Sequence, residues 1–114
     1  MSSTDNNLRV PPHSLEAEQA VLGGLLLDHQ AFDQVLEVLQ ASDFYSPDNR
    51  LIFTAMGRLS EAGKPIDIIT ASELLEQDGD LERIGGIAHL AELARQTPGT
   101  SNLITYSQIV RERA

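Results

Sequence analysis

The sequence predicts an all-α domain of five to seven helices, and three observations support this fold class. Apolar residues recur at helical spacing along most of the chain, and prolines, glycines and N-cap residues separate the segments. Aromatic residues make up only 4% of the sequence and tryptophan is absent, so leucine, isoleucine, valine and alanine must form the core. At 114 residues without an internal repeat, the chain has room for one such domain.

The start of the domain is predicted at residue 10. Residues 1–7 are polar and small, and we expect residues 1–9 to be a disordered leader. Pro11 and Pro12 favour an extended backbone, because each proline fixes its own φ and restricts the preceding residue. Ser14 is then a suitable N-cap for the first helix, and residues 10–100 are interpreted as a helical head.

The first helix has an acidic first turn and an apolar second half. Glu16 and Glu18 place negative charge where the helix dipole favours it, whereas residues 20–27 contain no charge, which is typical of a helix inside a bundle. Gly23 and Gly24 each cost about 1 kcal/mol relative to alanine in a helix interior. We therefore expect a close helix crossing here, within the domain rather than with a partner, although the second possibility stays open.

A second and a third helix follow. Asp28 is positioned to cap the second helix, which the pair Ser42-Asp43 ends. The pair Ser46-Pro47 is an N-cap followed by a first-turn proline, and the third helix should run to a C-terminal glycine at Gly63. The apolar stripes of these helices are Phe32, Val35, Leu36 and Leu39, then Leu51, Ile52, Ala55, Met56 and Leu59.

The stretch at residues 57–65 superficially resembles a phosphate-binding loop. Five residues rather than four separate its two glycines, and Pro65 stands where a serine or threonine hydroxyl would bind magnesium. A helix C-terminus is also the wrong end for a phosphate. We interpret this stretch as a helix cap and a turn.

The second half of the chain predicts shorter elements. Residues 66–69 are expected to form a short, extended, buried segment, and residues 70–73 a capping box that opens a helix through Gln77. A single turn at residues 81–84 and a pair of glycines precede the next helix. The loop Thr97-Pro98-Gly99 then leads to a last helix that begins near Ser101.

The last helix is predicted to be the truncated start of a longer element at residues 101–114. Its apolar stripe is followed by Arg111-Glu112-Arg113-Ala114, without a C-cap, glycine or proline. The stripe could belong to the core or to a seam between protein chains, and the residues alone leave both readings open. It consists of Leu103, Tyr106, Ile109 and Val110.

Composition excludes several classes of function. A formal net charge of −9 with eight scattered basic residues argues against binding nucleic acid or an anionic membrane. The sequence has no cysteine, its three histidines are far apart, and no nucleophile motif is present. We therefore predict no catalytic, cofactor-binding or metal-binding residues in this chain. Its apolar runs are also too short to span a bilayer, so we expect a cytoplasmic protein.

Several short motifs, taken in order, resemble the N-terminal domain of the bacterial replicative DNA helicase family, DnaB. Each motif is unspecific alone, but their order and spacing are specific, and the resemblance covers the chain from residue 10 to its end. The motifs are Val10-Pro11-Pro12-His13-Ser14, Glu16-Ala17-Glu18-Gln19-Ala20-Val21-Leu22-Gly23-Gly24, Asp43-Phe44-Tyr45, Ile52-Phe53, Pro65-Ile66-Asp67, Ile69-Thr70, Gly85-Gly86, Leu90-Ala91-Glu92-Leu93, Thr97-Pro98 and Ile109-Val110-Arg111-Glu112-Arg113-Ala114.

The resemblance implies a helical head joined to a helical hairpin, followed in the family by an ATPase motor domain that this chain lacks. ATP and magnesium are then expected only in that motor domain. The family role implies a non-catalytic domain that pairs within a hexameric collar and docks the C-terminal domain of primase, with a helicase loader as a further possible partner. A small DNA-binding helix-turn-helix module is the alternative, although no basic recognition helix is present.

One departure from the family concerns the helix after the glycine pair. Relatives often carry an aromatic residue where this chain has His89, so a primase contact there would be altered and could become sensitive to pH. Together with the last helix, this gives the predicted protein interface: His89, Leu103, Tyr106, Ile109 and Val110.

Overall fold

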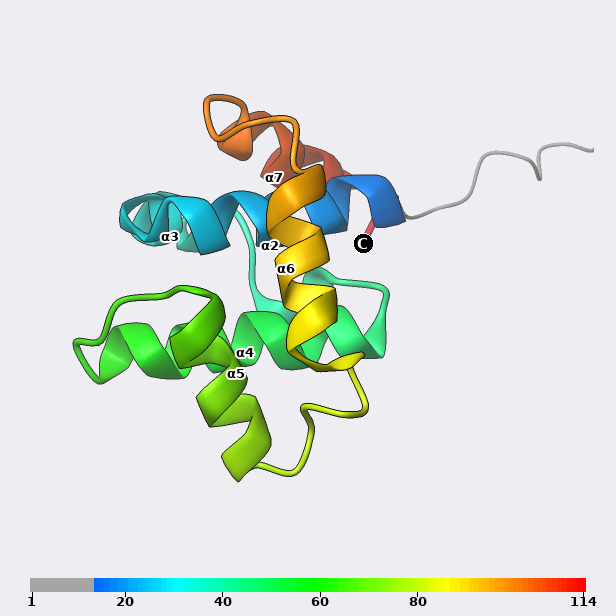
Figure 1. Ribbon diagram of the computed structural model, residues 1–114. Helices are drawn as coiled ribbons and strands as arrows, with labels where there is room; N and C mark the ends of the chain where they lie inside the picture. The colour runs from blue at the N-terminus through cyan, green and yellow to red at the C-terminus, as the bar shows by residue number, and fades with distance from the viewer. Residues whose placement is uncertain (1–13) are drawn as a thin grey trace, which may run out of the picture.

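The computed structural model describes residues 14–114, which form six α-helices, two short 3-10 turns and no strand (Figure 1). The predicted all-α class is confirmed. The predicted leader at residues 1–9 and the proline pair after it lie outside the described residues. The elements are α2 (Leu15–Leu27), η1 (His29–Ala31), α3 (Phe32–Leu36), η2 (Ala41–Asp43), α4 (Pro47–Glu61), α5 (Ile68–Gln77), α6 (Gly86–Gln96) and α7 (Leu103–Glu112).

Helix α2 is the centre of the fold. It packs against α4, α6 and α7, and its apolar residues are buried around most of its circumference, as predicted for a helix inside a bundle. Figure 1 shows α6 crossing over α2, with α7 on another side of the same helix. Three α2 side chains have no exposed surface: Val21, Leu22 and Leu25.

The two glycines of α2 explain how closely the neighbouring helices approach. A Cβ at Gly23 would overlap the carbonyl oxygen of Leu93 in α6, and a Cβ at Gly24 would overlap the side chain of Leu103 in α7. The glycines therefore serve crossings within the domain, which confirms the favoured interpretation. Because the C-terminal half of α2 meets the first residue of α7, the two helices run antiparallel along their shared contact.

Helix α4 begins and ends as the sequence predicts. Its first residue is a proline, and Ser46 is the N-cap, whose Oγ accepts a hydrogen bond from the Asn49 N–H at 3.3 Å. At the other end Gly63 has φ +72°, and the Lys64 N–H donates to the Leu59 carbonyl at 2.9 Å, which is the pattern of a Schellman cap. The apparent phosphate-loop motif is thus a helix C-terminus.

Helix α5 begins earlier than predicted. Its N-cap is Asp67, whose carboxylate accepts from the Thr70 N–H at 2.8 Å, while the Thr70 hydroxyl accepts from the Asp67 N–H at 3.0 Å. The prediction of an extended buried segment was therefore wrong at Ile68 and Ile69, which form the first turn of α5. Ile69 is 59% exposed, and only Ile66 is buried as expected.

The region after α2 also differs from its prediction. Asp28 makes no side-chain capping bond, and the chain forms the 3-10 turn η1 before the five-residue helix α3. Leu39 lies beyond the end of α3, yet it is 2% exposed, because the loop after α3 folds back onto the core. Burial was correctly predicted for Phe32, Val35 and Leu39, but Leu36 of the same stripe is 47% exposed, and the helix is shorter than predicted.

The predicted turns precede α6, and the predicted loop lies between α6 and α7. Residues 81–85 form turns, and Gly85, the N-cap of α6, has φ +104°, a left-handed conformation that glycine adopts without strain. Helix α6 ends before Thr97, its C-cap, and α7 begins at Leu103, two residues after the predicted start near Ser101.

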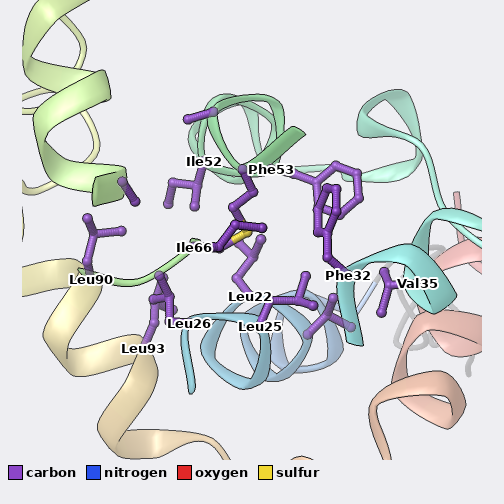
Figure 2. Packing of buried hydrophobic residues seen from close by; sticks show 14 of the residues in the cluster. Leu22, Leu25, Leu26, Phe32, Val35, Ile52, Phe53, Ile66, Leu90 and Leu93 are labelled. Carbon is purple, nitrogen blue, oxygen red and sulfur yellow. The ribbon is translucent and has the colours of Figure 1, made fainter. Parts of the chain in front are cut away.

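The core joins residues from all six helices. Its three phenylalanines lie in a row, with ring centroids 5.4 Å apart for Phe32 and Phe53 and 4.9 Å apart for Phe44 and Phe53. Figure 2 shows aliphatic side chains of α2, α4 and α6 pointing toward one another beside this row. Labelled examples are Leu22, Leu25, Leu26, Ile52, Leu90 and Leu93, and Ile66 joins them from the loop between α4 and α5.

Candidate protein-binding groove

A groove lies over the N-terminal half of α2. Helices α6 and α7 both pack along α2 but have little contact with each other, so the end of α6 and the second half of α7 form two walls above an α2 floor. The enclosed volume is about 690 Å³. The groove is lined by Ser14, Glu16, Ala17, Gln19, Ala20, Leu93, Gln96, Thr97, Pro98, Tyr106, Ile109 and Arg113.

The α6 wall is fixed by the loop that follows this helix. Pro98 prevents α6 from continuing, because proline has no N–H to donate and restricts the residue before it. The hydroxyl of Thr97 donates to the carbonyl of Ala20 at 3.3 Å, which fastens the end of α6 to the floor. The loop predicted at residues 97–99 therefore determines the width of the groove.

The four predicted interface residues of α7 differ in how deeply they are buried. Tyr106 and Ile109 are partly buried and line the groove. Leu103 and Val110 are each 2% exposed and belong to the core, where Leu103 packs on Gly24. Leu103 and Val110 therefore belong to the core, which is one of the two possibilities that the sequence left open. Of the four stripe residues, Tyr106 and Ile109 alone are available to a partner.

The fifth predicted interface residue lies elsewhere. His89 is in the first turn of α6, partly buried against Gly85, and does not line the groove. It precedes Gln96, a groove residue, by seven positions, which is about 10 Å along a helix. The predicted interface therefore covers two separate surfaces, one at each end of α6.

A model of the family described as "DnaB-like helicase N terminal domain" matches residues 10–112. This chain belongs to that family. The matched region is the N-terminal domain of DnaB, which is the non-catalytic part of that protein.

Similar proteins place this DnaB-type domain among replicative helicases. The chain is 56% identical over 95 residues to the replicative DNA helicase DnaB of Buchnera aphidicola subsp. Acyrthosiphon pisum, covering 83% of this chain and 21% of that protein. It is 50% identical over 105 residues to DnaB of Pasteurella multocida, covering 92% and 22%. The chain thus spans about a fifth of the length of these relatives.

A solved structure shows the same arrangement of helices. The crystal structure of the N-terminal domain of DnaB helicase from Mycobacterium tuberculosis superposes with a TM-score of 0.88 at 40% sequence identity. The match covers 91% of this chain and 72% of that chain. The predicted boundary between a head ending at residue 100 and a hairpin beginning at 101 stays a prediction, although α7 contributes to the core of the head.

One residue has a second role that the sequence analysis did not predict. Glu18, expected only to place negative charge in the first turn of α2, is 1% exposed. Its carboxylate accepts from the N–H groups of Tyr45 and Ser46 at 2.7 and 3.3 Å, and from the Asn49 side-chain amide at 2.9 Å. Because Ser46 caps α4, Glu18 joins the start of α4 to α2, directly behind the groove floor.

The signal for this role was present in the spacing of α2. Glu18 precedes Val21, Leu22 and Leu25 by three, four and seven residues, so it lies on the same buried face of the helix. A carboxylate on such a face needs several hydrogen-bond donors to offset the loss of water. The spacing could therefore have indicated a buried, satisfied carboxylate, though not its partners.

The described part of the chain shows no cluster of histidine and carboxylate side chains able to hold a metal ion. Among the same residues, no helix has the length and apolar character needed to cross a membrane.

Proposed function

We propose that this chain is the assembly and partner-docking domain of a hexameric replicative DNA helicase that unwinds duplex DNA at the replication fork. In this role it contributes to the collar of the ring and recruits primase through that protein's C-terminal domain, with a helicase loader as a further possible partner. The observation that carries the proposal is the α2/α6/α7 groove, a partly apolar surface on a domain of this family.

The same proposal assigns the chemistry of the helicase to other parts of such a protein. ATP and magnesium would act in the motor domain, and this domain would need no cofactor. Since its relatives are replicative DNA helicases, we place its action in the cytoplasm, beside the chromosome.

The proposal also predicts that the domain does not bind DNA directly. Its net charge is −9, and binding to phosphates depends on clustered lysine and arginine. The alternative of a helix-turn-helix module gains no support, because no described helix carries more than two arginines or any lysine. Micromolar binding of single-stranded DNA at physiological salt would contradict this part of the proposal.

Primase docking can be tested by titrating isotope-labelled protein with the C-terminal domain of primase. We expect amide shift changes at His89 or along residues 103–114. Ile109→Lys places a charge in the groove and should weaken binding, whereas Ile69→Lys changes an exposed isoleucine outside it and serves as the matched control. No shift change at either surface would refute the docking role.

Self-association requires a separate measurement. The molar mass of this chain should be compared by light scattering with that of a version extended through the following helix. A monomer that dimerises only on extension would place the pairing surface in the predicted hairpin. If both versions stayed monomeric at high concentration, the collar role would lose its support.

A further inference from the structure

We infer that the groove binds two turns of an amphipathic α-helix from a protein partner, with a cation beside Glu16 and a carboxylate beside Arg113. The inference rests on the proposed docking function and specifies the chemistry of the partner. Three observations on the groove support it: its floor, its walls and its two charged residues.

The floor allows a helix to approach closely. Where α6 and α7 cover α2, the contacts are made at Gly23 and Gly24, whose small size brings those helices near. The small residues continue toward the N-terminus as Ala17 and Ala20, which line the groove and are 6% and 8% exposed. Helix axes pack 8 to 10 Å apart depending on the side chains between them, so alanines permit a third helix to pack on α2 as well.

The dimensions suit a short helical contact. The groove residues at the start of α2 run from Ser14 to Ala20, which are seven residues, or about 10 Å along the axis and two helical turns. Tyr106 and Ile109 supply partly exposed apolar surface on one wall, and Pro98 supplies it on the other, where Leu93 is buried. An amphipathic helix laid into an apolar groove is a common mode of protein recognition.

Arg113 differs from the other arginines of the described chain. Arg58, Arg83 and Arg95 form ion pairs with carboxylates, and Arg50 and Arg111 donate to main-chain carbonyls. Arg113 has no such contact within residues 14–114, and it lines the groove. A guanidinium presents paired donors that match a carboxylate, so a partner's aspartate or glutamate is the expected ligand.

Glu16 provides the opposite charge. It is exposed on α2, it lines the groove, and it lies outside ion-pair distance of Arg113 in the described structure. A helix that carried only basic or only acidic residues here would satisfy one of these charges and be repelled by the other. A helix with a basic residue near Glu16 and an acidic residue near Arg113 satisfies both.

The test is a selection from displayed 14-residue helix-forming peptides. Each has leucines on one face, and lysine, glutamate or glutamine is varied on the two flanking edges. Selected peptides are then synthesised, and their dissociation constants for the folded chain are measured by fluorescence anisotropy. We expect the selected peptides to carry both lysine and glutamate beside the leucine face. Glu16→Lys and Arg113→Glu should each weaken binding about three- to tenfold.

Two further variants test the location. Gln19→Trp fills the groove from an exposed position, so it should fold normally and weaken binding roughly tenfold or more. Ile69→Lys, on α5 outside the groove, should leave binding unchanged. Circular dichroism confirms that each variant is folded before its affinity is compared.

Three results would overturn the inference: no enriched peptide, enriched peptides without a charge pattern, or peptides that bind Gln19→Trp as tightly as the unchanged chain. These results are independent of the proposed function, which depends on primase binding and self-association. A groove that selects such peptides in a protein that does not bind primase would support the inference and remove only the named partner.

Discussion

The substitution Glu18→Ala should destabilise the domain far more than any surface change on the same helix turn. It removes an acceptor that receives hydrogen bonds from the Tyr45 and Ser46 N–H groups at 2.7 and 3.3 Å, and from the Asn49 amide at 2.9 Å. Glu18 is 1% exposed and Asn49 4%, whereas the two N–H bonds are part-buried. Leaving the buried Asn49 amide without this acceptor costs about 1–3 kcal/mol, and losing each part-buried bond costs about 0.5–1.5 kcal/mol, so the sum is about 2 kcal/mol at the lower end.

That loss is large against the total stability of a small domain, which is about 5–15 kcal/mol. Each kcal/mol shifts the melting temperature of a domain of this size by about 4–8 °C, so the predicted decrease is at least about 8 °C. Urea unfolding followed by the helical circular dichroism signal measures the change in free energy directly. Glu18→Gln keeps the shape and one acceptor, and it should have an intermediate effect.

The matched control is Glu16→Ala. This residue is exposed two positions earlier on α2 and makes only a favourable interaction with the helix dipole, worth about 0.3–1 kcal/mol. If the two alanine variants unfolded at the same urea concentration, the assignment of Glu18 as the joint between α2 and α4 would be refuted.

The remaining predictions concern packing and caps, each measured by urea or thermal unfolding. Gly23→Ala would overlap the carbonyl oxygen of Leu93 and should cost about 1–3 kcal/mol, whereas Gly57→Ala, with only an ordinary contact at 3.9 Å in α4, should stabilise by about 0.5–1 kcal/mol. The opposite order would contradict the close crossing. Asp67→Ala removes the α5 N-cap and should lower the free energy of unfolding by about 1 kcal/mol. Unchanged stability would indicate that the helix begins at the predicted capping box, residues 70–73. Arg111→Ala should cost about 1 kcal/mol by removing a 3.0 Å bond to a main-chain carbonyl, and an unchanged midpoint would show that bond to be unimportant.

Local sequence signals, such as capping residues, prolines and glycines, predicted the helices. They gave the wrong start for α5, where two capping motifs overlap. Ser46 and Gly63 mark α4 because the cap residues and the fixed backbone angles of proline and glycine act within a few residues. Around α5 the sequence offers two boxes, one from Asp67 to Thr70 and one beginning at Thr70. The earlier box was missed, although it adds a turn to the helix and uses an aspartate, which is among the best N-caps.

The groove could not be predicted from such signals, because it depends on how α6 and α7 lie on α2. The sequence indicated the apolar stripe of α7, but the helix crossing at Gly24 determines that Leu103 is buried while Tyr106 remains at the groove. The same crossing brings Arg113 to the end of the groove beside the first turn of α2.

The two glutamates of helix α2 have different roles: Glu18 stabilises the fold, and Glu16 lies in the proposed docking groove. Successive residues turn by about 100° around a helix, so Glu16 and Glu18 point about 160° apart. One lines the groove, and the other accepts hydrogen bonds from the start of α4. If the groove is a docking site, substitution of Glu16 should change affinity for a partner while stability changes little, and substitution of Glu18 should lower stability first. A partner whose affinity fell only when the domain lost stability would bind elsewhere on the molecule.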